Sequence, residues 1–431
     1  MNSFLKIIVL IIINLSILIS QCNSIDTASL PREGNEAVLV GNKIYYIGGR
    51  TASPRNFNTF LLDLSSDFSA TDPNFVQVSG LEYMPLPTWT SACLGEDNII
   101  YIFGGTDASQ PSLPEANTLY EIKSLNDTSL SWTTSSPKQG DTWPSARDGI
   151  FPIIDNLSRI FVWGGRNTGQ DNTTTYIFES NSWKGHKLAN TPNPRSSYSA
   201  TLLNDGRIIY IGGTSRSPYP DVNILETSTS SEEIKNRVGH SALLHSDSIS
   251  IIVYGGCYQS NEDITNSDYN EYSAVEIPDS DSVWILNTKT WTWSRPSVPS
   301  LSYITVTRGH TAVMYNGYMI IAFGVYGHYS FTSQVKVMDV RNLNSLAWVP
   351  TYKVANGHKL NLGLILGICG AIAGALAIFA LVIFFIRRRK SLEYVTHSNN
   401  EPVSEIIATV KSRVIPAQVQ DNFSIPEYNP S

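Results

Sequence analysis

Charged side chains are scarce in this sequence. Asp, Glu, Lys and Arg account for 16% of its 431 residues, and the formal net charge is −7. Proteins that hold nucleic acid need a basic patch to neutralise phosphates, so this balance predicts no nucleic-acid partner. The aromatic content of 10%, with 29 Gly and 22 Pro residues, instead indicates an all-β chain that is rich in turns.

Cysteine is equally rare. The four cysteines are Cys22, Cys93, Cys257 and Cys369. Small secreted domains are held together by several disulfides, whereas a domain of this size can rely on its hydrophobic core. We therefore expect no disulfide framework.

The sequence also lacks the patterns that carry catalysis. Its seven histidines include no His-x-x-x-His spacing and its cysteines no Cys-x-x-Cys spacing, so no metal site is predicted. A Gly-x-Ser-x-Gly nucleophile turn and a glycine loop for phosphates are missing too. The expectation is a protein that is not an enzyme and uses no cofactor.

What the chain does contain is a repeated strand. In the stretch Ile208 to Gly213, a run of β-branched and aromatic residues ends in Gly-Gly, which is typical of a buried strand that stops in a sharp turn. The first glycines of the six copies fall at 48, 104, 164, 212, 255 and 324, so the steps are 56, 60, 48, 43 and 69 residues. Repeats of about 40–50 residues, lengthened by insertions, are typical of propeller blades.

Each copy has the same companions. A strand of small residues opens it, as in Arg237 to Ala242, and a third strand follows the Gly-Gly turn, as in Tyr120-Glu121. His240 and His310 share one position in the opening strand, which indicates a structural role for both. A fourth strand carries a large aromatic residue, with phenylalanine as the stand-in in the first copy: Phe75, Trp132, Trp183, Trp293 and Trp348.

This order resembles the kelch motif, in which Arg and Gly-His-Ser-Ala precede a strand ending in Gly-Gly and a spaced tryptophan follows. The resemblance implies an all-β, six-bladed kelch-type β-propeller, which we place at residues 25–352. In the sixth copy Val325 replaces the second glycine, and the fourth copy has no tryptophan. In the second copy, Pro87 or Trp89 stands near the position of the arginine.

Two apolar segments flank the repeats. Residues 1–22 include Lys6 and the apolar run Ile7 to Ile19, which predicts a signal peptide, with a retained signal anchor as the alternative. Residues 362–386 carry no charge and would span about 37 Å as a helix, enough to cross a bilayer. Basic residues 387–390 follow, so the tail at 387–431 is expected to be cytoplasmic.

The predicted topology is therefore that of a type I single-pass protein of the plasma membrane, with an extracellular propeller. The proline-bearing tail is expected to be mostly disordered. Gly363, Gly367, Gly370 and Gly374 form two Gly-x-x-x-Gly spacings, which would allow a homodimer through the membrane helix. Chance also produces such spacings in a segment rich in Gly and Ala, so dimerisation stays open.

Binding is expected on the loops that follow Gly-Gly, because function on rigid scaffolds tends to sit on loops. In a four-stranded blade these loops share one face with the connections between blades. They mix basic and aromatic residues, which suits a protein or glycan ligand. The candidate binding residues are Arg50, Arg55, Arg166, Arg216, Tyr219, Tyr258, Tyr326 and Tyr329.

Three further features concern the outer domain. Asn126, Asn156 and Asn172 lie in glycosylation sequons beside expected turns. The loop from Cys257 to Ser282 holds seven acidic residues and no basic one, and we expect it to be a solvated insertion. Cys93 and Cys257 belong to the second and fifth of six blades, too far apart for a disulfide.

The function expected from these observations is non-enzymatic recognition at the cell surface, in adhesion or as a receptor. Galactose oxidase also carries kelch-like blades, so a copper-radical oxidase is one alternative. That family completes its copper site from an all-β domain after the propeller, and here the apolar segment begins about ten residues after Tyr352. A membrane scaffold or sorting protein that acts through its tail is the other alternative.

Overall fold

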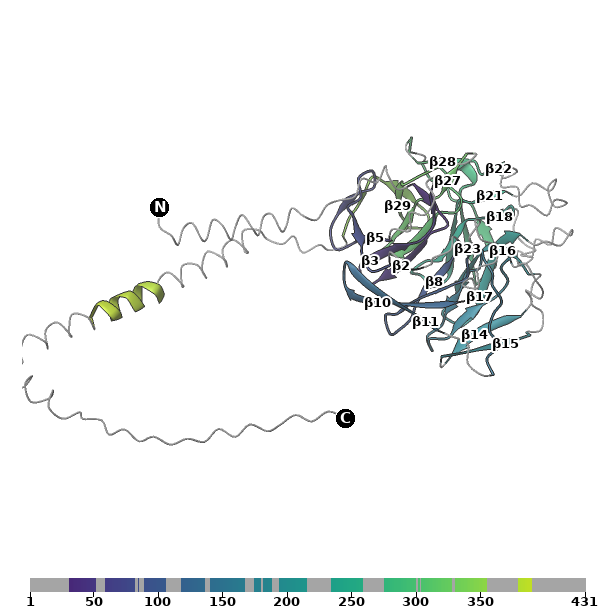
Figure 1. Ribbon diagram of the computed structural model, residues 1–431. Coiled ribbons are helices and arrows are strands. Elements are labelled where there is room, and N and C mark those ends of the chain that lie inside the picture. Colours follow the sequence, from purple (N-terminus) through teal and green to yellow (C-terminus); the bar gives the residue numbers. More distant parts are fainter. Residues whose placement is uncertain are drawn as a thin grey trace, which may run out of the picture. The chain divides into compact units, whose positions relative to one another are not determined.

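The structure is a computed structural model, which describes most of the predicted propeller and one short helix (Figure 1). Contacts divide the chain into two units, residues 1–355 and 356–431. The residues described are 31–51, 59–81, 84, 89–105, 118–135, 140–166, 174–179, 181–187, 194–214, 234–258, 275–299, 301–302, 304–327, 330–354 and 379–389.

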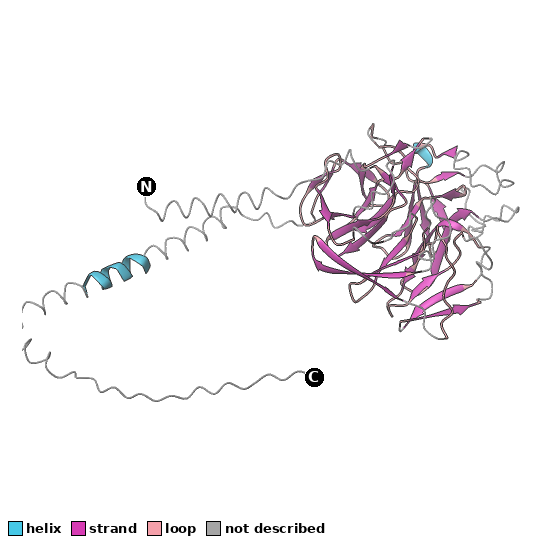
Figure 2. Cartoon of the chain, in the orientation of Figure 1, coloured by secondary structure: helices cyan, strands magenta, loops and turns pink. Residues whose placement is uncertain are grey.

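Six antiparallel sheets form the main body of the first unit, and four smaller sheets of two or three strands accompany them among the described residues (Figure 2). We number the six main sheets as blades one to six in chain order. Blade one consists of β2 (Glu36–Val40), β3 (Lys43–Ile47), β5 (Thr59–Asp63) and β7 (Phe75–Val78). Blade two consists of β8 (Ser91–Leu94), β9 (Ile100–Phe103), β10 (Leu119–Asn126) and β11 (Ser129–Ser135). Blade three consists of β12 (Ile153–Ile154), β13 (Ile160–Val162), β14 (Thr175–Glu179) and β15 (Ser182–His186).

Blade four has two strands within the described residues, and blades five and six have four each. Blade four contains β16 (Ser196–Leu202) and β17 (Ile208–Thr214). Blade five contains β19 (Ser241–Leu244), β20 (Ser250–Tyr254), β23 (Val283–Asn287) and β24 (Thr292–Ser294). Blade six contains β25 (Thr311–Tyr315), β26 (Tyr318–Ala322), β29 (Val335–Asp339) and β30 (Ala347–Val349).

The blades form a closed ring. The first strand of each blade contacts the first strand of the next, in the circuit β2, β8, β12, β16, β19, β25 and back to β2. Six apolar clusters lie between the blades, one at each seam. Because each sheet covers the faces of its neighbours, no blade has to bury its apolar residues alone. The predicted six-bladed propeller is therefore confirmed in the described residues.

The aromatic residue of the fourth strand lies where the sequence predicted. Trp183, Trp293 and Trp348 each pair with the residue of the third strand that occupies the same register, and Phe75 takes this place in blade one by pairing with Leu62. The fourth strand of blade four, predicted around residues 224–234, lies outside the described residues except for the buried Ile234.

One residue position joins each blade to the one before it, and we call it the joint. The N–H of the second glycine donates to the backbone carbonyl of the residue that opens the next blade. Arginine fills this position in blades one, three, four and five, and its guanidinium donates to the carbonyl of the first glycine in its own blade. The bonds from a glycine N–H to a carbonyl of the next blade are Gly105 to Arg147 (2.9 Å), Gly165 to Arg195 (2.8 Å), Gly256 to Thr307 (2.9 Å) and Gly324 to Arg32 (2.7 Å). The bonds from an arginine side chain to a glycine carbonyl of the same blade are Arg32 to Gly48 (3.0 Å), Arg147 to Gly164 (2.8 Å), Arg195 to Gly212 (3.1 Å) and Arg237 to Gly255 (3.4 Å).

In blade six, the prediction that Val325 replaces the second glycine is wrong. Gly324 is the second residue of this turn, with φ of +99°, and Phe323 is the first, with φ of +66°, the same as Gly255 in blade five. The register agrees, because Thr311 pairs with Ala322 as Ser241 pairs with Tyr254. A phenylalanine in this left-handed conformation is strained, and burial of its ring offsets the cost. The ring stacks on Phe75 at 5.7 Å between centroids.

Among the strands that the structure describes, none is shared between the first and last blades of the propeller. Instead β31 (Thr351–Tyr352) pairs with β6 (Phe68–Ser69), and the Tyr352 hydroxyl donates to the Leu64 carbonyl at 3.2 Å. Tyr352 is fully buried and stacks on Phe68. The residues that follow β30 therefore hold blade one against blade six.

In the second unit, residues 379–389 are helical, and their apolar side chains are exposed, Phe379 by 65% and Phe384 by 57%. None of the helices within the described residues combines the length and the apolar character that a bilayer crossing requires. The predicted signal peptide, most of residues 362–386 and nearly all of the tail lie outside the described residues.

Thr307 occupies the joint of blade six, and a buried lysine supplies the positive charge there. Lys336 in β29 is fully buried and donates to the Thr307 hydroxyl at 2.8 Å. Its ammonium lies 5.5 Å from the ring centroid of Tyr254. Burial lowers the pKa of Lys336 to about 7. Near neutral pH the folded protein therefore binds less than one proton at this amine, while the unfolded chain binds one.

We expect Lys336→Met to stabilise the protein most at pH 6 and below, where wild type must bury a charged amine. Between pH 7 and 10.5 the unfolded chain holds more protons at this residue, so wild-type stability rises with pH and the difference between the two proteins shrinks. Thermal unfolding of both proteins at a series of pH values measures that difference. A difference that does not change with pH would show that the amine does not titrate in this range.

Candidate functional site

The segments that enter the blades lie beside the segments that follow Gly-Gly, as the sequence predicted. β1 (Arg32–Glu33) pairs with β4 (Arg50–Thr51), and β18 (Arg237–Val238) pairs with β21 (Cys257–Tyr258). Equivalent bridges join Asp148 to Arg166 and Arg308 to Val325. We call the side of the propeller that carries these pairs the connection face. The turns between first and second strands and between third and fourth strands lie on the opposite face.

A ring of left-handed residues surrounds the centre of the connection face, and we call it the mouth ring. Backbone hydrogen bonds run from blade to blade along it: Gly34 donates to Gly309 (2.9 Å), Gly309 to Gly239 (2.8 Å), Gly239 to Ser197 (3.2 Å) and Ser197 to Gly149 (2.8 Å). Each blade contributes one residue with φ between +55° and +64°: Gly34, Trp89, Gly149, Ser197, Gly239 and Gly309.

Trp89 is therefore the mouth-ring residue of blade two. The alternative that Trp89 stands at the arginine position is wrong, because the joint arginines precede the mouth ring by two residues. That register assigns the joint of blade two to Pro87, which lies outside the described residues. The exchange of glycine for tryptophan was visible in the sequence, but no arginine stands two residues before it to mark the register.

Arg50 and Arg166 lie at the same place in two different blades, and each pairs with an acid of the opening segment. The Arg50 Nε donates to Glu33 Oε1 at 3.0 Å, and its Nη2 also contacts this oxygen. Arg166 makes two bonds to Asp148, of 3.0 Å and 2.9 Å. The arginine side chains are 34% and 35% exposed, whereas the acids are 3% and 10% exposed. The buried carboxylates thus fix the direction of two guanidinium groups that reach the surface.

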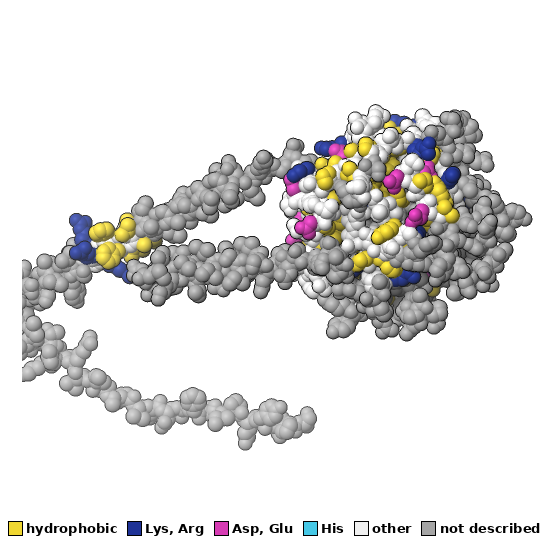
Figure 3. Space-filling view, turned by 90° about the horizontal axis from the view of Figure 1, so that it is seen from above, with side chains coloured by type: hydrophobic (Ala, Val, Ile, Leu, Met, Phe, Trp, Pro, Cys, Tyr) yellow, Lys and Arg dark blue, Asp and Glu magenta, His cyan; other side chains and the backbone are white. Residues whose placement is uncertain are grey.

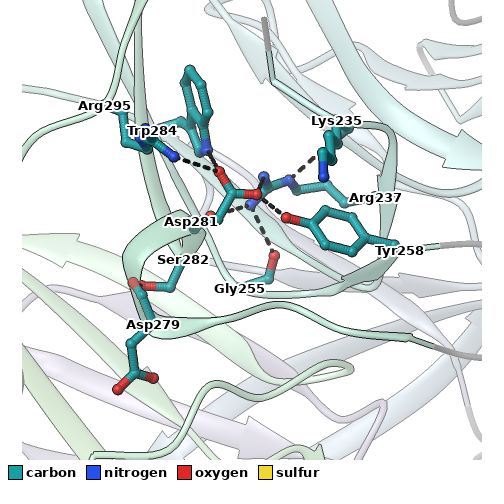
Figure 4. Close-up of polar contacts among 9 residues, drawn as sticks. All are labelled: Lys235, Arg237, Gly255, Tyr258, Asp279, Asp281, Ser282, Trp284 and Arg295. Carbon is teal, nitrogen blue, oxygen red and sulfur yellow. Dashed lines mark hydrogen bonds and ion pairs between the residues drawn. The ribbon is translucent and has the colours of Figure 1, made fainter. Parts of the chain in front are cut away.

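Tyr258, a third predicted binding residue, belongs to a network around Asp281 (Figure 4). The tyrosine hydroxyl and the Trp284 Nε1 (2.8 Å) both donate to this carboxylate, and Arg237 lies 3.3 Å away. Burial and the hydrogen bond to Asp281 raise the pKa of Tyr258 to about 12. Arg295 lies 3.8 Å from the same acid and remains 43% exposed.

This network corrects the expectation of a solvated acidic insertion from Cys257 to Ser282 at one residue, Asp281, whereas Glu276 and Asp279 are exposed. Asp281 is only 6% exposed, because the joint arginine of blade five and Trp284 surround it. Glu276 is exposed but accepts a hydrogen bond from the Gly327 N–H. Residues 259–274 of this loop lie outside the described residues.

Tyr326 is 41% exposed in β27 (Val325–Tyr326), which pairs with β28 (Ser330–Phe331). Next to it the Arg308 Nη1 donates to the Gly327 carbonyl at 2.9 Å. The structure therefore brings Arg50, Arg166, Tyr258 and Tyr326 to the connection face. The remaining candidates, Arg55, Arg216, Tyr219 and Tyr329, lie outside the described residues.

The two described sequons lie on the opposite face. Asn126 is exposed at the turn between the third and fourth strands of blade two, where its side-chain oxygen accepts from the Thr128 N–H at 3.0 Å. Asn156 is exposed in the turn between the first and second strands of blade three. Asn172 lies outside the described residues. Both positions leave room for a glycan away from the mouth ring.

The described side chains suggest neither a disulfide nor a metal centre. Cys93 lies in blade two and Cys257 just after the second strand of blade five, where its Sγ donates to the Val238 carbonyl at 3.8 Å. Burial raises the pKa of Cys93 to about 12, so this thiol is unreactive at neutral pH. Within the described ranges, no group of three or more His, Cys, Asp or Glu side chains is arranged to hold a metal ion.

The comparisons with known proteins agree with this architecture. Residues 34–234 match the family model for the KLHDC2/KLHL20/DRC7 Kelch-repeats domain. Over these residues, which include the strands of blades one to four, the chain is similar to kelch repeats. The solved structure of YjhT is similar to it with a TM-score of 0.51 and 13% identity, over 74% of this chain and 98% of that one. At that identity the likeness concerns the fold alone. No curated protein matched the chain.

The Glu33–Arg50 pair of the propeller should contribute more to stability than a fully exposed pair. We expect a double-mutant cycle of Glu33→Gln and Arg50→Ala to give a coupling of about 1–3 kcal/mol, because the carboxylate is buried. The matched control is Asp205 and Arg207, both 53% exposed, with an expected coupling below about 0.5 kcal/mol. Urea unfolding of the four proteins in each cycle gives these values, and equal couplings would contradict the difference in burial.

Proposed function

We propose that this protein is a membrane-anchored binding protein, without enzymatic activity, that holds a protein or glycan ligand on the connection face of its kelch propeller. One observation supports it above the others. Segments from blades one, three, five and six meet around a single mouth ring, and each is tied down by backbone pairing. A rigid scaffold that gathers side chains from several blades in this way is well suited to recognition.

The chemistry of this face suits binding better than catalysis. Arg50 and Arg166 pair with acids, and Tyr258 has a raised pKa that keeps its hydroxyl protonated at neutral pH. Acidic, basic and apolar side chains are interspersed among the described residues in the space-filling view (Figure 3). Mixed surfaces with aromatic and arginine residues are common in protein interfaces.

A charge reversal on each face tests where the ligand binds. The full chain in detergent is exposed to a library of random dodecapeptides on phage and to a glycan array, and each binder is measured on Arg166→Glu and Arg207→Glu. We expect Arg166→Glu to weaken binding by at least about tenfold, and Arg207→Glu, on the opposite face, to leave it unchanged. Binders that respond only to Arg207→Glu, or no binders at all, would refute the proposal.

The anchor is the second part of the proposal, and the uncharged segment 362–386 with its basic flank supports it. Expressed in a eukaryotic secretory cell, a chain that ends at residue 355 should appear in the medium, whereas the full chain stays with the membrane fraction. Peptide-N-glycosidase should reduce the mass of the released domain at Asn126 and Asn156. A full chain that stays in the soluble cytosolic fraction without glycans would contradict both the anchor and the export.

A further inference from the structure

Tryptophan at position 89 is an exception within the mouth ring. Four of the six ring positions are glycine and a fifth is Ser197, and all share nearly the same left-handed backbone. Glycine adopts this conformation at no steric cost, whereas a bulky residue is strained there. Strain of this kind gathers at functional sites. An aromatic side chain at this position therefore costs stability that glycine would not.

The indole lies across the ring toward blades one and six. A methyl group on Gly34 would come within 2.9 Å of Trp89 Cδ2, and one on Gly309 within 3.0 Å of Trp89 Cη2. The same methyl on Gly309 would lie 3.2 Å from Glu33 Oε2. One side of the indole thus rests on bare glycine backbone and meets the Glu33 carboxylate. Trp89 is half-buried, so part of the ring remains accessible at the centre of the connection face.

Ion pairs lie in the blades on both sides of the blade that carries the indole. Glu33 is paired with Arg50, whose guanidinium lies 5.7 Å from the ring centroid of Phe331. Blade three, on the other side of blade two, carries the equivalent pair of Asp148 and Arg166. Arg308, beside Gly309, donates to the Gly327 carbonyl. Because Arg50 and Arg166 are each balanced by an acid, these pairs favour an apolar partner over a strongly charged one.

We infer that Trp89 is the central contact of the connection face, where it seats an apolar or aromatic side chain of a partner protein. This inference rests on the proposed function. Tryptophan and arginine are the residue types that most often dominate the binding energy of protein interfaces, and such residues cluster near the centre of the contact. Trp89 has this position because all six blades surround the mouth ring.

A sugar is the less favoured occupant. A sugar ring can stack on an indole, but its hydroxyl groups also need several polar side chains with unused hydrogen-bonding capacity. Around Trp89, the charged groups of Glu33, Arg50, Asp148 and Arg166 bind one another. A flat apolar group can cover the indole without breaking these ion pairs.

The test uses Trp89→Gly and Trp89→Phe in the full chain, with the dodecapeptide library and the glycan array as probes. Glycine suits the ring backbone, so the first variant should fold with at least wild-type thermal stability. We expect the selected peptides to share an apolar or aromatic residue, to bind Trp89→Gly at least about 30-fold more weakly, and to bind Trp89→Phe within about fivefold of wild type.

Trp291→Gly is the matched control. Trp291 has φ of +57°, against +56° for Trp89, and lies in the turn between β23 and β24 on the opposite face. The Trp291→Gly substitution should leave peptide binding unchanged. Peptides that bind Trp89→Gly as well as wild type, yet lose affinity for Arg166→Glu, would overturn the role of Trp89 and leave the proposed function standing. Glycans that depend on Trp89, in the absence of such peptides, would replace the protein partner by a sugar.

Discussion

The joint between blades is the interaction on which the rest of this propeller depends. At four seams, a carbonyl of the opening segment accepts a hydrogen bond from the turn of the preceding blade, and the arginine at that position holds the turn of its own blade. The carbonyl bond brings backbone against backbone, so the first residue of the turn has little room for a side chain. A methyl on Gly255, for example, would lie 2.6 Å from the Thr307 carbonyl. The joint thus explains the Gly-Gly repeat and the arginine together.

Blade six shows how far this joint can be altered. Lysine from the third strand replaces the arginine, and Phe323 replaces the first glycine. Both changes are tolerated because neighbouring groups adapt. Asn35 in blade one takes the position that His240 and His310 hold in blades five and six. The Phe323 ring fills the seam between blades six and one, beside Phe75 and Tyr46. The last seam is therefore held by aromatic packing and by the β6–β31 pair as well as by the joint.

The same geometry separates the two faces of the propeller. The joint and the mouth ring fix the opening segments and the segments after Gly-Gly on the connection face, whereas the described sequons lie in turns on the other face. A ligand on the connection face would therefore not meet glycans at Asn126 or Asn156. The paired acids give the exposed arginines a fixed direction, so less side-chain entropy is lost when a partner binds.

The sequence by itself determined the all-β fold, the number of blades and the aromatic residue of the fourth strand in five blades. These features follow from local rules, because strand periodicity and glycine turns repeat in every copy. It also located Arg50 and Arg166 on the loops after Gly-Gly. It could not show that both arginines are paired, since their acids precede them by 17 and 18 residues and meet them only across the blade.

Only the tertiary structure decided the register of the irregular copies. Phe323 and Trp89 occupy left-handed positions where the local sequence gives no glycine, and their rings are accommodated by residues of adjacent blades. The buried state of Asp281 was equally hidden, because its partners come from three separate segments. Ring closure brings these distant residues together, and periodicity along the chain carries no information about such contacts.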